Sequence, residues 1–277
     1  MAGQNRRLWE KDDLSKPRIF TIAGFPLNPK NLHEKQQLIK DIEDLKGIYL
    51  DTAMWDSRIT HVISYNQDMT EKVMAAIAAG RWVVTVKFVT DSKAHGDWLE
   101  SPRLFVSHAV VLHHRKNWFS KGAKGGVFHG MNAAMMLDDS VKNEVYKRVI
   151  KAGGGSIASI ESLSLYRELR CGDVTHVFVD PWITKVSNSR NRIFEKCRRH
   201  VSDFQPIVKF LWYKYVYSLI KDSPGGSAEK YNIFDQKVQK SSNTNAKLEY
   251  KVKRKMRHSF EIQQKRIKTD VIVLDSS

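Results

Sequence analysis

The hydrophobic pattern is densest over residues 60–92, where its period changes from strand-like to helix-like twice. Residues 60–64 are rich in β-branched side chains, as in a buried strand, and a helical stripe of apolar residues then runs up to Gly80. Residues 82–85 predict a second strand, and residues 86–92 predict a second helix. Helices that join consecutive short strands imply a parallel sheet with right-handed crossovers.

The segment before residue 60 completes a small α/β domain. Residues 19–23 are a short apolar stretch that predicts a strand, and a helical stripe then runs from residue 31 until Gly47 ends it. Residues 48–50 predict the next strand. Together with the dense stretch, residues 17–104 contain strands joined by helices, which is the pattern of an α/β domain.

The same order of elements recurs in the second half of the chain. Residues 133–137 predict a strand, and the apolar stripe of residues 141–150 predicts a helix that ends at the glycines 153–155. Thr175-His176-Val177 then repeats Thr60-His61-Val62. The remaining predicted elements are a short helix over residues 193–197, a strand over residues 206–208 and a final helix that includes Trp212, Val216 and Leu219. This recurrence indicates two copies of one domain.

These patterns divide the chain into five parts. They are a disordered start over residues 1–16, a first repeat over 17–104, a linker over 105–126, a second repeat over 127–221 and a disordered basic tail over 222–277. In the linker we expect Val106 to Leu112 to pack between the two repeats, and Lys121 to Gly126 to form a flexible joint. The tail is polar and holds 12 Lys and Arg residues against 7 Asp and Glu residues.

The net charge indicates the kind of partner, and the cysteine content indicates the redox environment. A formal net charge of +16 points to anionic partners, which include nucleic acid, phosphorylated protein and acidic surfaces, and charge alone does not choose among them. Only Cys171 and Cys197 are present, which predicts reduced thiols in an intracellular protein and no zinc site. No apolar run approaches the ~18 residues of a membrane span, and the start lacks an apolar signal region, so we expect no membrane partner.

One charged residue in the dense stretch is out of place. Lys72 lies in the first turn of its predicted helix, where the helix macrodipole disfavours a cation. A bound anion would interact favourably with both the lysine and the free backbone N–H groups of that turn. The alternative is an exposed lysine whose position costs about a few tenths of a kcal/mol.

Several motifs occur in the order typical of one known family. In the first half these are Ala23-Gly24-Phe25, Gly47, Thr60-His61-Val62-Ile63, residues 75–80, Trp82-Val83-Val84, Phe88 and Asp91-Ser92. In the second half they are Gly153-Gly154, Thr175-His176-Val177 and Trp212. Residues 17–221 therefore resemble a tandem pair of BRCT repeats. GDWLES at residues 96–101, and Trp118 with GGVFHGM at 125–131, further resemble the C-terminal BRCT pair of the topoisomerase-II-binding checkpoint scaffold family.

The resemblance implies an α/β fold with two BRCT-like domains, each a four-stranded parallel sheet flanked by helices, packed together through helices. It also implies binding of phosphoserine or phosphothreonine peptides. In the family the phosphate is held by a hydroxyl and a backbone N–H at the end of the first strand, and by a lysine at the start of the second helix. Gly24 matches the backbone N–H, Lys72 matches the lysine, and Lys35 matches a basic position that extends the pocket.

The chain departs from the family pattern at Ala23, which stands where the hydroxyl residue is expected. One charge-assisted hydrogen bond, typically ~1.5–3 kcal/mol, is then absent unless Thr21 or a water replaces it. In the second repeat, Asp138 and Asp139 stand at the corresponding strand end, where they would repel a phosphate. We therefore expect one phosphate-binding site, in the first repeat.

Other candidate residues point away from catalysis and metal binding. His61 and His176 lie at matching strand starts, which favours structural hydrogen bonding over acid–base chemistry. His113-His114 has no acidic or cysteine partner at metal-ligand spacing, so a surface position is the better interpretation. The sequence has no phosphate-binding glycine loop, nucleophile elbow or paired-carboxylate signature, and we expect neither an enzyme nor a cofactor nor a bound metal.

The tail carries two candidate motifs. A compact basic run is typical of a nuclear import signal or a nucleic-acid patch, with a solvated charge cluster as the alternative. Its residues are Lys251, Lys253, Arg254, Lys255 and Arg257. The apolar end of the chain resembles a SUMO-interacting motif that adds a strand to a partner's sheet edge, or else docks on the chain's own sheet. Its residues are Val271, Ile272, Val273 and Leu274.

Together these features predict a nuclear, non-enzymatic adaptor in the DNA damage response or replication checkpoint. The expected partner is a phosphorylated checkpoint or repair protein, bound through the first repeat and the groove between the repeats, and SUMO is a candidate partner of the tail. Two alternatives stay open. One is direct DNA binding through the basic surface, and the other is a scaffold for an unphosphorylated protein, which Ala23 favours.

Overall fold

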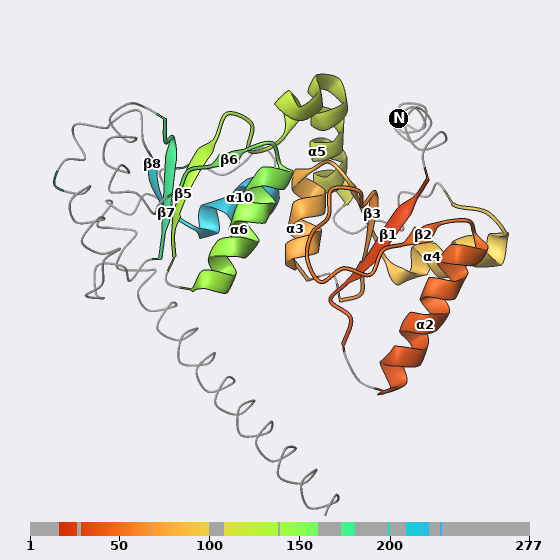
Figure 1. Ribbon diagram of the computed structural model, residues 1–277. Helices are drawn as coiled ribbons and strands as arrows, with labels where there is room; N and C mark the ends of the chain where they lie inside the picture. The colour runs from red at the N-terminus through yellow and green to blue at the C-terminus, as the bar shows by residue number, and fades with distance from the viewer. Residues whose placement is uncertain are drawn as a thin grey trace, which may run out of the picture.

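The computed structural model describes residues 17–26, 29–66, 68–99, 108–137, 139–159, 173–180, 199, 209–221 and 228 (Figure 1). Several sequence predictions lie outside these ranges. They are the short helix over 193–197, the strand over 206–208, Cys171, Cys197, Asp138, and the two tail motifs over 251–257 and 271–274. The described residues include both sheets and the ends of their strands, where the candidate site lies.

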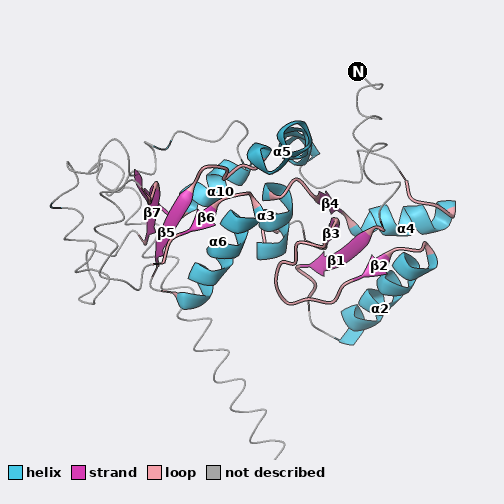
Figure 2. Ribbon diagram, turned by 45° about the horizontal axis from the view of Figure 1, so that its top comes forward, coloured by secondary structure: helices cyan, strands magenta, loops and turns pink. Residues whose placement is uncertain are grey.

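The first half of the chain forms a four-stranded parallel sheet with the strand order β2-β1-β3-β4. Its elements are β1 (Ile19–Ala23), α2 (Pro29–Asp44), β2 (Ile48–Tyr49), β3 (His61–Ser64), α3 (Glu71–Ala78), β4 (Trp82–Val84) and α4 (Val86–His95). Helices α2 and α4 pack together on one side of this sheet, and α3 lies on the other side (Figures 1 and 2).

The second half forms a second parallel sheet with the equivalent order β6-β5-β7-β8. Its elements are β5 (Asn132–Met136), α6 (Ser140–Ala152), β6 (Ser156–Ile157), β7 (His176–Val179), β8 (Lys209–Trp212) and α10 (Lys214–Lys221). The predicted fold class, two four-stranded parallel sheets flanked by helices, is confirmed. Of the described helices, none has both the length and the apolar character that a membrane span requires.

The repeated Thr-His pair has the same structural role in both sheets. The Thr60 hydroxyl oxygen lies 2.8 Å from His61 Nδ1, and the Thr175 hydroxyl oxygen lies 2.8 Å from His176 Nδ1. His61 is fully buried and stacks on Phe20, with ring centroids 4.7 Å apart. Burial, together with nearby arginines, holds the pKa of His61 well below its usual range, and burial lowers the pKa of His176 to about 4. Both rings are therefore neutral packing groups, as the sequence predicted.

Two strand assignments differ from the sequence predictions. β8 pairs with β7 residue by residue, and Trp212 lies opposite Val179. Trp212 therefore ends a strand and does not belong to the final helix, which begins at Lys214. β6, which was not predicted, is a two-residue strand beside β5. Both assignments depend on pairing with distant strands, because strands this short carry little local signal.

The linker is more regular than its glycine-rich sequence predicts. It forms α5 (His108–Lys121), followed by the 3-10 helix η2 (Gly122–Gly125) in place of the expected flexible joint. The face that α5 buries consists of Val111, His114 and Arg115. These residues have the helical spacing i, i+3, i+4. Two of the three are basic, so the helix lacks the apolar stripe by which the other helices were found.

The buried side chains of α5 contact both repeats. Arg115 Nη1 donates a hydrogen bond to the Gly80 carbonyl oxygen at the end of α3, over 3.0 Å. His114 Nε2 lies 2.9 Å from the Ile220 carbonyl oxygen in α10. The sequence-based prediction of a surface position is therefore wrong for His114, whereas His113 is exposed.

The two repeats pack together through helices, with α3 of the first against α6 and α10 of the second (Figure 2). Gly153 at the end of α6 permits this close approach, because a Cβ atom there would lie 2.5 Å from the Phe128 ring and 3.2 Å from Ala78 Cβ. Val111 of the linker is 1% exposed. Residues 106 and 107 of the segment predicted to pack between the repeats, 106–112, lie outside the described part.

Candidate functional site

The first turn of α3 lies against the carboxyl end of β1, and Lys72 joins the two. Thr70 caps the helix, with an extended backbone and a hydroxyl that accepts a hydrogen bond from the Val73 N–H over 3.4 Å. The Lys72 ammonium donates to the Ile22 carbonyl oxygen at 3.0 Å and to the Thr21 hydroxyl at 3.3 Å. The cation that looked misplaced in the sequence is thus held at the end of β1.

Lys72 is a partly buried charge. Burial is the main cause that lowers the pKa of Lys72 from its ordinary value, the Lys35 ammonium lowers it further, and the carboxylates of Asp51 and Glu71 oppose both effects. A partly desolvated ammonium interacts more strongly with an anion than a fully hydrated one does, because the local dielectric constant is lower. The site is therefore suited to an anionic ligand.

Gly24 follows β1 in a backbone conformation that favours glycine. Its φ is +72°, and its carbonyl oxygen accepts a hydrogen bond from Asn66 Nδ2 at 3.2 Å. A Cβ atom at this position would meet only Thr70 Cγ2 at 3.9 Å and Asn66 N at 4.0 Å, so the backbone angle and not crowding requires the glycine. No residue in the described part of the chain accepts a hydrogen bond from the Gly24 N–H. This donor lies beside the cap of α3.

Ala23 and Thr21 share one face of β1, because side chains alternate along a strand. Ala23 is 4% exposed and pairs with Ser64 on β3. The hydroxyl that the BRCT pattern expects at this position is absent. On the same face of β1, Thr21 is fully buried and bound to Lys72, and the buried Ser64 lies opposite Ala23 on β3. Thr21 therefore positions the lysine, while the strand end itself offers no hydroxyl.

Lys35 approaches the same region from α2. Its ammonium lies 3.6 Å from Asp51 Oδ1, and it lies above the Tyr49 ring at 5.9 Å from the ring centroid. The Tyr49 hydroxyl also donates to Asp51 Oδ1, at 3.2 Å. The Asp51 side chain is 76% exposed, so an incoming anion can compete with it for Lys35.

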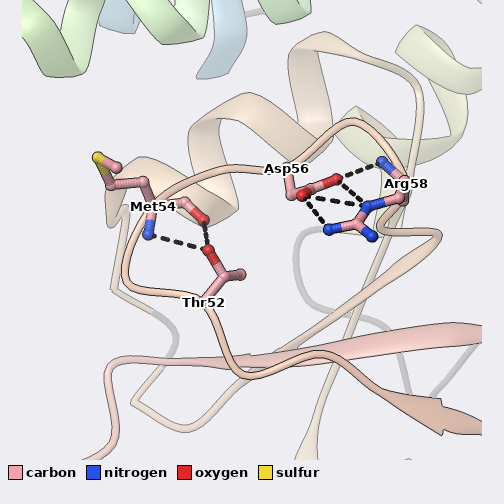
Figure 3. Close-up of polar contacts among 4 residues, drawn as sticks. All are labelled: Thr52, Met54, Asp56 and Arg58. Atoms are coloured by element: carbon pink, nitrogen blue, oxygen red, sulfur yellow. Dashed lines mark hydrogen bonds and ion pairs between the residues drawn. The ribbon is translucent and has the colours of Figure 1, made fainter.

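The loop between β2 and β3 is fastened by short-range polar contacts (Figure 3). The Thr52 hydroxyl donates to the Met54 carbonyl oxygen at 2.8 Å. The Asp56 carboxylate accepts hydrogen bonds from Arg58 Nη2 at 2.7 Å and from the Arg58 backbone N–H at 2.9 Å, and these contacts lower the pKa of Asp56 to about 2. These contacts join neighbouring residues within the loop.

The second repeat closes the corresponding strand end. In each sheet the second residue of the first strand pairs with the histidine of the Thr-His pair, so Leu137 is the counterpart of Gly24. Asn143 Oδ1 accepts a hydrogen bond from the Leu137 N–H at 3.2 Å, and Asn143 Nδ2 donates to the Leu137 carbonyl oxygen at 2.8 Å. Asp139 caps α6 by accepting from the Lys142 N–H at 3.1 Å. A carboxylate and a satisfied backbone make this end unsuited to a phosphate.

The structure brings Lys72 to the end of β1 that Gly24 follows, and the charges of Lys35 and Asp51 act on Lys72 from nearby. Sequence reasoning missed Asp51, and also Glu71 and Arg148, which form an ion pair between the repeats. A partner 77 positions away along the chain leaves no local pattern. The described residues contain no cluster of three or more His, Cys, Asp or Glu side chains that could hold a metal ion.

Comparisons with known proteins bear on the family. No protein-family model matches the chain. A BRCT domain-containing protein of Arabidopsis thaliana is 31% identical over 158 residues, which cover 53% of this chain and 11% of that protein. The SMC5-SMC6 complex localization factor protein 1 of Homo sapiens is 22% identical over 158 residues, which cover 53% of this chain and 14% of that protein. The chain thus spans a small part of the length of these relatives.

A solved structure extends the likeness to both repeats. The BRCT5-BRCT6 domains of S. pombe Brc1 match with a TM-score of 0.53 and 14% sequence identity, over 74% of this chain and 93% of that one. At this identity the likeness shows the fold alone. Together with the two parallel sheets, it shows that the chain has the fold of a tandem BRCT pair.

Proposed function

We propose that this chain is a non-enzymatic adaptor that binds a phosphoserine or phosphothreonine peptide through its first repeat, with Lys72, Gly24 and Lys35 at the phosphate. The observation that carries the proposal is the position of Lys72. The first turn of α3 directs its ammonium to the end of β1, beside the Gly24 backbone.

The chemistry of this end of β1 suits a phosphate group. A phosphorylated side chain carries a charge of about −1.5 to −2 and three acceptor oxygens. The hydrogen-bond partners of Lys72, the Thr21 hydroxyl and the Ile22 carbonyl, are neutral, so a phosphate dianion competes well for its ammonium. The Gly24 N–H and the first-turn N–H groups of α3 supply further donors.

The rest of the peptide is proposed to follow the groove between the repeats, from α3 towards α6. These two helices pack side by side, and α3 begins at the phosphate end (Figure 1). Residues beyond the phosphate would then meet side chains of the second repeat. In this proposal residues 17–104 and 127–221 act as two repeats, with one phosphate pocket in the first.

The proposed setting is nuclear, in DNA damage or replication checkpoint signalling. The name of the human relative, a localization factor of the SMC5-SMC6 complex, supports a recruiting role. The resemblance to the topoisomerase-II-binding scaffold pair supports a phosphorylated checkpoint or repair protein as the partner. The basic run over residues 251–257 is proposed as a nuclear import signal or nucleic-acid patch, and residues 271–274 as a SUMO-binding strand.

Direct DNA binding is the second candidate, favoured by the charge of the linker. Residues 108–137 contain no Asp or Glu. Lys116, Lys121 and Lys124 are exposed along α5 and η2. A strip of this kind can neutralise phosphates of a duplex without reading its sequence.

Capture from a degenerate phosphopeptide library, compared with capture of duplex DNA at physiological salt, tests the proposal. Lys72→Glu is expected to lower phosphopeptide affinity at least about a hundredfold, because it replaces an attraction by a repulsion at the phosphate. The melting temperature should fall modestly, because the change also removes the Lys72 hydrogen bonds to Thr21 and Ile22, and folding of the variant is checked before its affinity is compared. Lys40→Glu, an exposed lysine of α2, is the matched control and should capture normally.

Two outcomes decide between the candidates. If Lys72→Glu captures phosphopeptides as well as wild type does, the assignment of the phosphate pocket is wrong. The DNA candidate would be favoured if the protein binds duplex DNA tightly and captures no phosphopeptide. This DNA binding should weaken steeply with salt and persist in Lys72→Glu, because many lysines share such contacts.

A further inference from the structure

The residue before the proposed phosphate-binding lysine is an acid. Glu71 precedes Lys72 in the first turn of α3. The helix macrodipole favours an acid at this position, but a bound phosphate would be repelled by it. The two charges already interact, since Glu71 raises the pKa of Lys72. A site for a dianion therefore needs this carboxylate to be neutralised.

Arg148 supplies the opposite charge, and it comes from the second repeat. From α6, Arg148 Nε donates to Glu71 Oε1 at 2.6 Å, and Arg148 Nη2 donates to Glu71 Oε2 at 2.8 Å. The side chain of Glu71 is 14% exposed and that of Arg148 is 28% exposed. The Trp55 N–H adds a third hydrogen bond to Glu71 Oε1, at 3.1 Å. A bidentate, largely buried arginine–carboxylate pair is among the stronger ion pairs in proteins.

We propose that Arg148 screens Glu71, so that phosphate binding by the first repeat depends on a charge from the second. The inference rests on the proposed function and names a residue that acts on the ligand through another residue. Without Arg148, the Glu71 carboxylate would face the phosphate unscreened. With Arg148 in place, the first turn of α3 presents the Lys72 charge alone.

The screening account differs from a purely mechanical one. If the ion pair only fixes the angle between the repeats, then loss of either partner should weaken binding, and loss of both should not restore it. If Arg148 screens Glu71, its loss matters only while Glu71 is charged. The Glu71→Gln change should then rescue the Arg148→Gln variant.

The test measures the affinity of one library-selected phosphothreonine peptide for four full-length proteins: wild type, Arg148→Gln, Glu71→Gln and the double variant. Arg148→Gln is expected to bind about three- to tenfold more weakly, and the loss should shrink at high salt. Glu71→Gln should bind as well as wild type or up to about threefold more tightly. The double variant should return to within about twofold of wild type. Lys147→Gln removes a neighbouring cation of α6 that pairs with Glu144, and should bind like wild type.

The results that would contradict screening differ from those that would contradict the proposed function. A double variant as weak as Arg148→Gln, or a Glu71→Gln protein that binds more weakly than wild type, would overturn screening. The Glu71→Gln result stands even if Arg148→Gln does not fold. If Lys72→Glu abolishes phosphopeptide binding but Arg148→Gln binds like wild type, only this inference is overturned. No capture by the wild-type protein would overturn both.

Discussion

The two repeats have the same sheet order, yet the backbone groups that follow their first strands differ in their hydrogen bonding. After β1, Gly24 turns away with φ +72° and the Lys72 ammonium reaches the strand end. After β5, the amide of Asn143 occupies both the N–H and the carbonyl of Leu137. One backbone end is left available to a ligand and the other is filled by a side chain of the same domain.

Under the proposed function, this contrast explains how a duplicated fold keeps one binding site. The sheets and the Thr-His pairs are equivalent because they build the core. The strand ends differ, because Leu137 and Asn143 are buried in the second repeat whereas Gly24 in the first is partly exposed. Function therefore follows the residues at one strand end, and the fold alone does not assign it.

Loss of the Asn143 amide should produce the largest change in the second repeat. Asn143→Ala removes two buried hydrogen bonds to Leu137 and is expected to lower the free energy of unfolding by about 2 kcal/mol. Chemical denaturation measures this. Val141→Ala on the exposed face of the same helix is the control. Phosphopeptide capture should stay intact, and a loss of capture at unchanged stability would mean that the second strand end also binds ligand.

Restoration of the missing hydroxyl should produce a smaller change, in the first repeat. Ala23→Ser places a hydroxyl at the end of β1, on the Thr21 face, and is expected to tighten phosphopeptide binding by roughly three- to tenfold. Met136→Ser, at the equivalent position of β5, should give no gain in binding. Calorimetric titration of both variants checks this. Weaker binding by Ala23→Ser would place the phosphate elsewhere.

Much of the fold could be predicted because its elements carry local patterns. The strands at Thr60 and Thr175, the helix before Gly80 and the glycines that end α6 were all visible in the sequence. The short strand β6, the strand that ends at Trp212 and the basic helix α5 were not. Their positions depend on pairing or packing with distant segments, for which a short sequence window holds no signal.

Some residues of the candidate site could likewise be predicted from the sequence, and others could not. Lys72 was conspicuous because a lysine is unfavourable in a first helical turn, and Gly24 stood directly after a predicted strand. The neighbours that tune the site were not visible. Asp51 meets Lys35 only when β2 has packed beside α2, and Arg148 reaches Glu71 only across the interface between the repeats.

The most direct test of the central claim is a titration of the isotope-labelled protein with a phosphothreonine peptide, followed by backbone amide chemical shifts. The account predicts saturable shifts at Gly24 and in the first turn of α3, including Lys72, and none at Leu137 or Asn143. The unphosphorylated peptide should produce no shifts at these positions. Shifts centred on Leu137, or equal shifts with the unphosphorylated peptide, would contradict the claim that the first repeat alone holds the phosphate.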